Sequence, residues 1–231
     1  MEIPQKELQY LSQTLEKLRR ELERRTKGHE ELERDLYEKR RYLWQELIGS
    51  AGAMQDSYER TAQESDIHEG EKAEDSSKMQ LSILKRMLEV PYFARIDFRE
   101  QGDRFPESVY IGRFGFTDLE TFTPVVCDWR SEIASMYYNY TPGPAQYTCP
   151  EGVVKGELEL KRQFQIERGR LLGCFDTTLS IEDQFLQRIL AARAGESMKT
   201  IVDSIQKSQD QIIRDRDSSI VLLLGCAGSG K

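Results

Sequence analysis

The chain has 231 residues, of which 38% are hydrophobic and 32% are charged, so its length and composition allow one or two domains with a buried core. Its formal net charge of −7 argues against a general coat for nucleic acid, although a local basic groove remains compatible with it. The four cysteines are scattered without a C-x-x-C pair, which argues against a metal site and a disulfide scaffold and favours the reducing cytoplasm. The N-terminus has no signal-like apolar region, and no apolar run approaches the ~20 residues of a bilayer span, which argues against a membrane protein.

The excess charge lies mainly in the first 48 residues, where leucines recur in alternating steps of three and four. These positions are Leu8, Leu11, Leu15, Leu18 and Leu22. The same register continues to Leu43, and oppositely charged residues such as Glu16 and Arg20 stand four apart between the leucines. The pattern predicts one helix from about 5 to 48, roughly 65 Å long at 1.5 Å per residue. Because its apolar stripe is narrow, this helix needs a partner helix.

A second helix is predicted from about 56 to 89, after a glycine-containing break at Gly49–Gly52. The two helices should form an antiparallel hairpin within one chain. The second helix regains apolar residues late, and its middle, ESDIHEGEKAED, is acidic and contains Gly70, so we expect that part to be a weak, solvated or frayed helix. The isolated histidines His29 and His68 are assigned no chemistry.

A strand-rich module is predicted to begin at Pro91, which ends the second helix. Alternating apolar residues predict strands in YFARIDF, SVYIGRFGF, FTPVVCDW, KGELELKRQFQIE and RLLGCF. In the fourth of these, the period of two places Leu158, Leu160, Phe164 and Ile166 on one face, with Lys161 on the other. Between the strands, SEIASMYYNY should form a short helix and TPGPAQYTCPEG a loop.

The last residues contain a complete G-x-x-x-x-G-K pattern directly after an apolar strand. It consists of Gly225, Cys226, Ala227, Gly228, Ser229, Gly230 and Lys231. In a P-loop, the glycines let backbone N–H groups surround a phosphate and the lysine neutralises its charge. We therefore predict a nucleotide-binding loop here, the alternative being a chance glycine turn. The Ser or Thr that normally follows and holds Mg²⁺ is missing, so we expect the chain to be the front part of a longer enzyme.

Gln209 is a second candidate for nucleotide binding. It stands on the apolar stripe of a helix predicted from about 198 to 214, sixteen positions before Gly225. A buried amide needs hydrogen-bond partners, and a glutamine amide can bond adenine through N6 and N7. The alternative is a glutamine at the edge of the core that bonds nearby backbone.

Together these features resemble a known family. The glutamine before the nucleotide strand is similar to the Q-motif of UvrD/Rep-type superfamily 1 helicases, and the longer pattern resembles the HelD-type (helicase IV-like) ATPases that bind bacterial RNA polymerase. The stretches that carry the resemblance are PYFARIDF, YIGRFGF, DWRSEIASMYYNYTPGPAQY, LKRQFQI, MKTIVDSIQKSQDQIIR and GCAGSGK.

This resemblance implies roles for the parts of the chain. The coiled coil would enter the secondary channel of the polymerase, and the motor would use ATP and Mg²⁺ to clear polymerase from nucleic acid. Gln209 would contact adenine, and Gly225 to Lys231 would hold the phosphates. The Walker B carboxylates and the arginine finger would lie beyond Lys231, so we expect these 231 residues alone to hydrolyse no ATP. Asp128-Trp129-Arg130 resembles a family signature, and we favour an Asp–Arg pair that braces a buried tryptophan over a catalytic role.

The predicted fold class is an α+β fragment with three parts: a coiled-coil arm at 1–90, a strand-rich module at 91–178, and Q-motif helices with the start of a P-loop α/β motor domain at 179–231. Two other functions remain open. One is a coiled-coil adaptor that binds polymerase without ATPase activity. The other is an unrelated P-loop enzyme, such as a kinase or GTPase, behind a coiled-coil arm.

Overall fold

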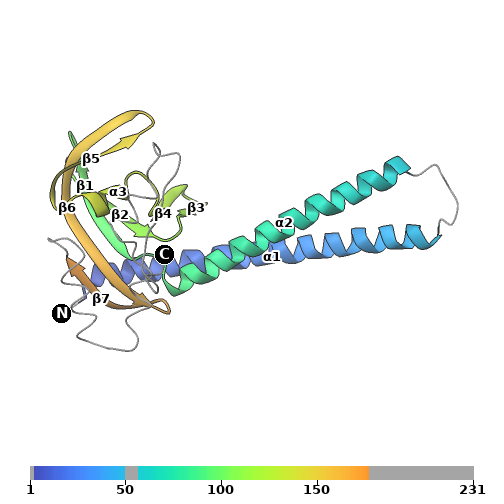
Figure 1. Cartoon of the computed structure of the whole chain (residues 1–231). Coiled ribbons are helices and arrows are strands. Elements are labelled where there is room, and N and C mark those ends of the chain that lie inside the picture. The colour runs from blue at the N-terminus through green and yellow to red at the C-terminus, as the bar shows by residue number, and fades with distance from the viewer. Residues whose placement is uncertain (1–2, 50–56, 177–231) are drawn as a thin grey trace, which may run out of the picture. The chain divides into compact units, whose positions relative to one another are not determined.

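The computed structural model describes residues 3–49 and 57–176, and the chain divides into two compact units (Figure 1). One unit comprises residues Pro4–Pro91 and consists of two long helices, and the other begins at Tyr92 and is built on a sheet.

The helical unit is an antiparallel pair, as predicted. Helix α1 spans Gln5–Gly49 and helix α2 spans Ser57–Glu89. Two contacts between the helices establish their direction: Arg25 donates a hydrogen bond to Gln80, and Arg40 Nη2 lies 2.6 Å from Glu71 Oε1. Later residues of α1 therefore contact earlier residues of α2. Pairing within one chain is confirmed, while Ser50 to Gly52 of the predicted turn lie outside the described residues.

The seam between the two helices follows the predicted leucine register over most of its length. Leu18 and Leu36 of α1 are fully buried, and α2 contributes the buried side chains of Leu81, Leu84 and Met87. Leu8 is an exception because its side chain is 39% exposed. The Arg25–Gln80 contact sets a register in which Leu8 lies beyond the end of α2 at Glu89.

The middle of α2 is helical throughout and most of its residues are exposed, so of the two alternatives the solvated helix is confirmed and fraying is not seen. Gly70 faces Leu36, and a Cβ atom at position 70 would overlap the Leu36 side chain. The glycine thus lets the two helices approach closely. The cross-helix pair between Arg40 and Glu71 lies beside it. Packing against α1 offsets the roughly 1 kcal/mol by which glycine disfavours a helix.

Between Tyr92 and Asp176, the described part of the sheet unit contains seven strands and one short helix, α3 (Ser135–Asn139). The strands are β1 (Ala94–Glu100), β2 (Glu107–Gly112), β3 (Phe116–Asp118), β4 (Thr123–Asp128), β5 (Gly143–Cys149), β6 (Gly152–Glu167) and β7 (Arg170–Asp176). Their order is β3-β4-β2-β1-β6-β5, with β7 also paired to β6. The β2–β4 pair is parallel and the other pairs are antiparallel, so the unit is a mixed sheet.

Two strand predictions need correction. SVYIGRFGF is not one strand, because β2 ends at Gly112 and the chain reverses before β3, so that β2 and β3 pair with β4 in opposite directions. TPGPAQYTCPEG is not a loop, because Gly143–Cys149 pairs with β6 as β5. Pro144 cannot donate to a ladder, but β5 lies at the end of the strand order, where a proline is tolerated.

Strand β6 is the longest strand and carries a bulge near its middle. Asp97 of β1 pairs with Leu160, whereas Phe98 pairs with Leu158, so Glu159 is left without an opposite residue. A bulge bends a strand and increases its twist, and Figure 1 shows β6 as a long curved strand. Along one edge β6 pairs with β1, and along the other it pairs first with β5 and then with β7.

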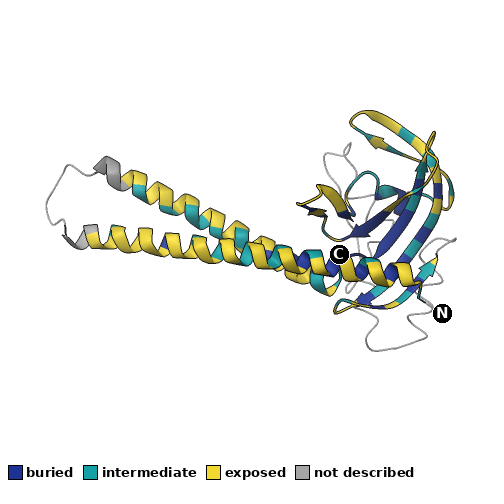
Figure 2. Cartoon of the chain, turned by 180° about the vertical axis from the view of Figure 1, so that it is seen from behind, coloured by how far each residue is buried: buried dark blue, intermediate teal, exposed yellow. Residues whose placement is uncertain are grey.

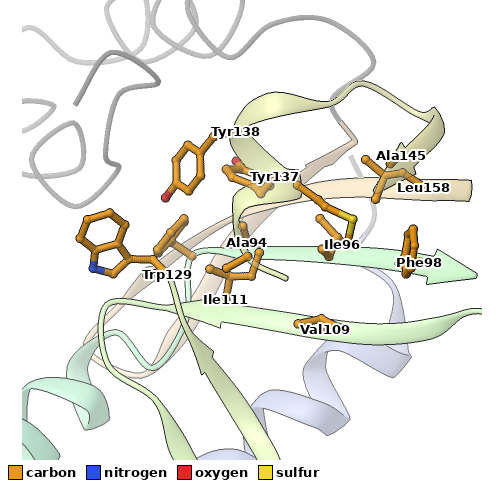
Figure 3. Close-up of a cluster of buried hydrophobic side chains, with 13 residues drawn as sticks. Ala94, Ile96, Phe98, Val109, Ile111, Trp129, Tyr137, Tyr138, Ala145 and Leu158 are labelled. Carbon is orange, nitrogen blue, oxygen red and sulfur yellow. The ribbon is translucent and has the colours of Figure 1, made fainter. Parts of the chain in front are cut away.

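The core of the sheet unit lies on the face that α3 covers (Figure 3). Its buried side chains come from β1, β2, β5, β6, α3 and the segment after β4. They are Phe93, Ala94, Ile96, Phe98, Val109, Ile111, Trp129, Ala134, Met136, Tyr137, Tyr138, Ala145 and Leu158. Tyr137 of α3 packs edge-on against Phe93, with ring centroids 6.0 Å apart. Figure 2 shows the buried residues concentrated in the strands, with exposed residues along much of both long helices.

Gly156 provides a test of how tightly β1 packs against β6. A Cβ atom at this position would overlap the backbone oxygen of Arg99 and the ring of Phe98. We expect Gly156→Ala to lower the free energy of unfolding of the sheet unit by about 1–3 kcal/mol, because backbone must move to admit the methyl group. Urea unfolding followed by the fluorescence of the buried Trp129 measures this change.

The matched control is Gly28→Ala, where nothing lies within 4 Å of the added Cβ atom. That substitution should leave the Trp129 transition unchanged while stabilising α1 by up to about 1 kcal/mol. Equal urea midpoints for Gly156→Ala and the unsubstituted chain would contradict the close packing of β1 on β6.

Candidate functional sites

The predicted nucleotide-binding residues lie outside the described part of the chain. They are Gln209 and the P-loop residues Gly225, Cys226, Ala227, Gly228, Ser229, Gly230 and Lys231. Their roles stay predictions. The signature Asp128-Trp129-Arg130 is described, and the structure also brings together polar side chains in the sheet unit that the sequence pattern did not predict.

The signature forms a tight turn at the end of β4. Arg130 Nε and Nη2 donate to the two carboxylate oxygens of Asp128 at 2.9 and 2.7 Å, and the Arg130 backbone N–H donates to Asp128 Oδ1 at 2.9 Å. Trp129 is 8% exposed, and its backbone N–H donates to the Gly112 carbonyl at 3.0 Å. The interpretation of an Asp–Arg pair beside a buried tryptophan is confirmed. The backbone hydrogen bond from Trp129 holds the turn against the end of β2. The Arg130 side chain is 63% exposed.

Opposing effects act on the Asp128 carboxyl group. Burial raises its pKa, but the hydrogen bonds and charge of Arg130, together with a bond from the Gly115 backbone, outweigh burial and leave the pKa below its ordinary value. The same pairing raises the pKa of Arg130. Asp128 is therefore a stable carboxylate at neutral pH and is unsuited to act as a general acid.

A buried polar cluster lies on the core face of the sheet. Lys161 is 4% exposed, its Nζ donates to the Tyr140 carbonyl at 3.2 Å, and it lies 4.9 Å from the ring centroid of Tyr137. Tyr137 Oη and Gln163 Oε1 are buried and have no hydrogen-bond partner among the residues that the structure describes. Burial also raises the pKa of Tyr137, which keeps the phenol neutral.

The predicted grouping of Leu158 with Leu160, on the face opposite Lys161, was wrong because of the β6 bulge. A strict period of two groups Leu158 with Leu160, but the unpaired Glu159 between them reverses the alternation. Leu158 therefore faces the core beside Phe98, while Leu160 faces the same side as Asp97. Beyond the bulge, Lys161 and its alternate neighbour Gln163 return to the core face.

An ion pair lies on the opposite face of β1. Arg95 donates through Nε and Nη2 to the two oxygens of Asp97, both at 2.7 Å, and through Nη2 to Ser108 Oγ at 2.9 Å. The guanidinium carbon lies 5.4 Å from the ring centroid of Tyr110, which stacks on Phe164. Because Arg95 is 5% exposed, this network offers little surface to a ligand.

The described residues hold no group of three or more His, Cys, Asp or Glu side chains placed to bind a metal ion. Within the same residues, no helix is both long and apolar enough to cross a membrane.

The fold defines the class of protein: an α+β chain in which an antiparallel helical pair precedes a mixed, bulged sheet. The family model for the N-terminal domain of DNA helicase IV, HelD, matches residues 4–194. That match covers both structural units and most of the chain, so the chain belongs to the HelD helicase family. A comparison with curated proteins gives no match.

The Asp128–Arg130 pair predicts a pH-dependent contribution to stability. A lowered pKa in the folded state means that the ionised carboxylate stabilises the fold above the unfolded-state pKa of about 4, and that this contribution is lost as the pH falls through the folded-state pKa. We expect Asp128→Asn to lower the free energy of unfolding by about 1 kcal/mol at pH 7, discounted for the exposure of Arg130.

Urea unfolding of the unsubstituted chain and of Asp128→Asn, followed by Trp129 fluorescence at pH 7 and at about pH 3, tests this expectation. The difference between the two proteins should shrink in acid. Arg130→Gln is the matched control, because it removes the same ion pair and should add little to Asp128→Asn in the double variant. An equal difference at both pH values would contradict the role of the ion pair.

Proposed function

We propose that this member of the HelD helicase family is the N-terminal part of a helicase-like ATPase that binds bacterial RNA polymerase through its helical pair. In the complete enzyme, ATP with Mg²⁺ would drive release of polymerase from nucleic acid. Gln209 would recognise adenine, and residues 225–231 would hold the phosphates. The adaptor alternative shares the polymerase contact but needs no nucleotide.

One observation carries the polymerase-binding part of this proposal. Helices α1 and α2, of 45 and 33 residues, pack on each other through a narrow seam. We call the part of α1 after Arg25, together with the part of α2 before Gln80, the distal half of the pair. In the distal half, Leu36 is buried and the residues that flank it are mostly exposed. A helical pair with so little core of its own offers two long charged faces to another molecule, which is the property that a docking arm requires.

The test is a chain with a shortened arm. Residues 26–79 are replaced by a short glycine-serine turn, which joins α1 to α2 where Arg25 contacts Gln80 and keeps the buried Leu18, Leu81, Leu84 and Met87. Binding of the 231-residue chain and of this variant to bacterial RNA polymerase core enzyme is measured by surface plasmon resonance. We expect the shortened arm to weaken binding by about 100-fold or more, the loss that a few interface anchors account for.

Lys231→Ala separates the arm from the nucleotide site, because it removes the P-loop cation and leaves the arm intact. Polymerase binding should not change in this variant, although ATP binding should weaken. If the shortened arm bound polymerase as tightly as the unaltered chain, the proposed function would be wrong. If binding depended on Lys231 as much as on the arm, the division of roles would be wrong.

A further inference from the structure

We propose that the distal half of α1 docks on an acidic, partly apolar protein surface through one stripe of side chains: Arg34, Tyr37, Arg41 and Trp44. The proposal rests on the proposed function, and it specifies which face of the arm makes the contact and what chemistry the polymerase surface must have. We call these four residues the docking stripe.

The docking stripe is a second heptad-like row on α1. Its residues are spaced by three, four and three positions, so they lie along one side of the helix. At about 100° per residue, they stand roughly 80° to 160° around the helix axis from the seam residue Leu36. The row that packs on α2 and the docking stripe are thus separate faces of one helix.

Both aromatic rings of the docking stripe are exposed to solvent. Tyr37 is 66% exposed and Trp44 is 64% exposed. A single exposed ring is common on a protein surface, but two large rings one heptad apart on a helix face match the spacing of anchors that insert into a groove of a partner. Tryptophan, tyrosine and arginine are also the residues that dominate binding energy at protein interfaces.

The charges of the arm are distributed unequally around this stripe. Two basic residues near the seam are neutralised within the arm, since Arg40 pairs with Glu71 and Lys39 lies 2.9 Å from Asp35. Arg34 and Arg41 are exposed, and neither makes an ion pair with another described residue. The docking stripe therefore offers two positive charges beside its rings, which complement an acidic surface.

The neighbouring helix has the opposite charge. From Thr61 to Asp75, α2 carries six acidic side chains and one lysine, whereas α1 carries four basic and two acidic side chains from Arg34 to Gln45. An acidic partner would attract the α1 side of the arm and repel the α2 side. The charge distribution thus selects one rotational orientation of the arm against the partner.

The spacing favours a protein partner over a nucleic-acid strand. Tyr37 and Trp44 are seven residues apart, about 10 Å along the helix axis, whereas consecutive bases stack about 3.4 Å apart. Glu30 and Glu38 border the stripe, so its positive charges are separate points and do not form the continuous basic row that a phosphate backbone follows. Separated apolar recesses with acidic side chains between them fit the stripe better than a strand of stacked bases.

The experiment uses the full 231-residue chain and bacterial RNA polymerase core enzyme. We expect Tyr37→Ala with Trp44→Ala to weaken binding by about 100-fold, and Arg34→Gln with Arg41→Gln to weaken it by about tenfold and to reduce its salt dependence. Because all four side chains are exposed, the substitutions should leave helix content unchanged by circular dichroism.

Matched controls lie on the same helix. Tyr42→Ala removes an exposed ring on another side of α1, and Arg19→Gln removes an exposed arginine near its N-terminal end. Each control should change the dissociation constant by less than about twofold.

The outcomes separate this inference from the proposed function. Suppose that the shortened arm lost polymerase binding while both stripe double variants kept a dissociation constant within about twofold of the unsubstituted chain. The proposal for the docking stripe would then be wrong, and the proposed function would stand. If the shortened arm bound polymerase normally, the proposed function would be wrong, and the docking stripe, which rests on it, would be wrong as well. If the stripe variants lost binding to a short single-stranded RNA but kept binding to polymerase, the protein partner would be the wrong class of ligand.

Discussion

The pairing of β6 with three other strands is the constraint on which the sheet unit depends. This strand holds β1 along one edge and both β5 and β7 along the other, and its bulge at Glu159 determines which side chains enter the core. Had the alternation continued from Leu158 without interruption, Leu160 would face the core and Lys161 would lie on the opposite face with Arg95 and Asp97. The bulge instead buries Lys161 against Tyr137 and leaves Leu160 to the Arg95–Asp97 face. One unpaired residue thus determines that Lys161 lies in the core.

The helical pair obeys a different constraint, which is the scarcity of apolar residues in the later part of α1 and the earlier part of α2. Leu81, Leu84 and Met87 of α2 supply a continuous seam late in that helix, whereas the earlier part of α2 relies on Gly70 and on the ion pair of Glu71 with Arg40. Close approach at Gly70 compensates for missing side-chain volume by letting Leu36 contact the α2 backbone region directly. Because so little of this segment is needed for packing, its outward positions are free to be selected for binding.

The features predictable from the sequence are those that depend on local periodicity. The bounds of both long helices, the leucine seam and the Asp128–Arg130 pair follow from spacing between near neighbours. The strand β5, the continuity of α2 through Gly70 and the burial of Lys161 depend instead on what another strand or helix presents, and local periodicity does not contain that information. Pro144 looks like a loop residue until its position at the sheet edge is known. The candidate nucleotide site, from Gln209 to Lys231, lies outside the described residues and beyond the family match, which ends at residue 194, so it stays a prediction from sequence motifs.

The unequal charge of α1 and α2 gives the arm a transverse electric dipole, directed across the helical pair and distinct from the dipole along each helix axis. In the field of a charged surface, such a dipole experiences a torque that rotates the arm about its long axis before any side chain makes contact. The rotation acts over roughly a Debye length, about 8 Å at physiological ionic strength, and weakens as salt rises. An arm with evenly mixed charge would reach the same surface in random rotational orientations, and most encounters would present the wrong face.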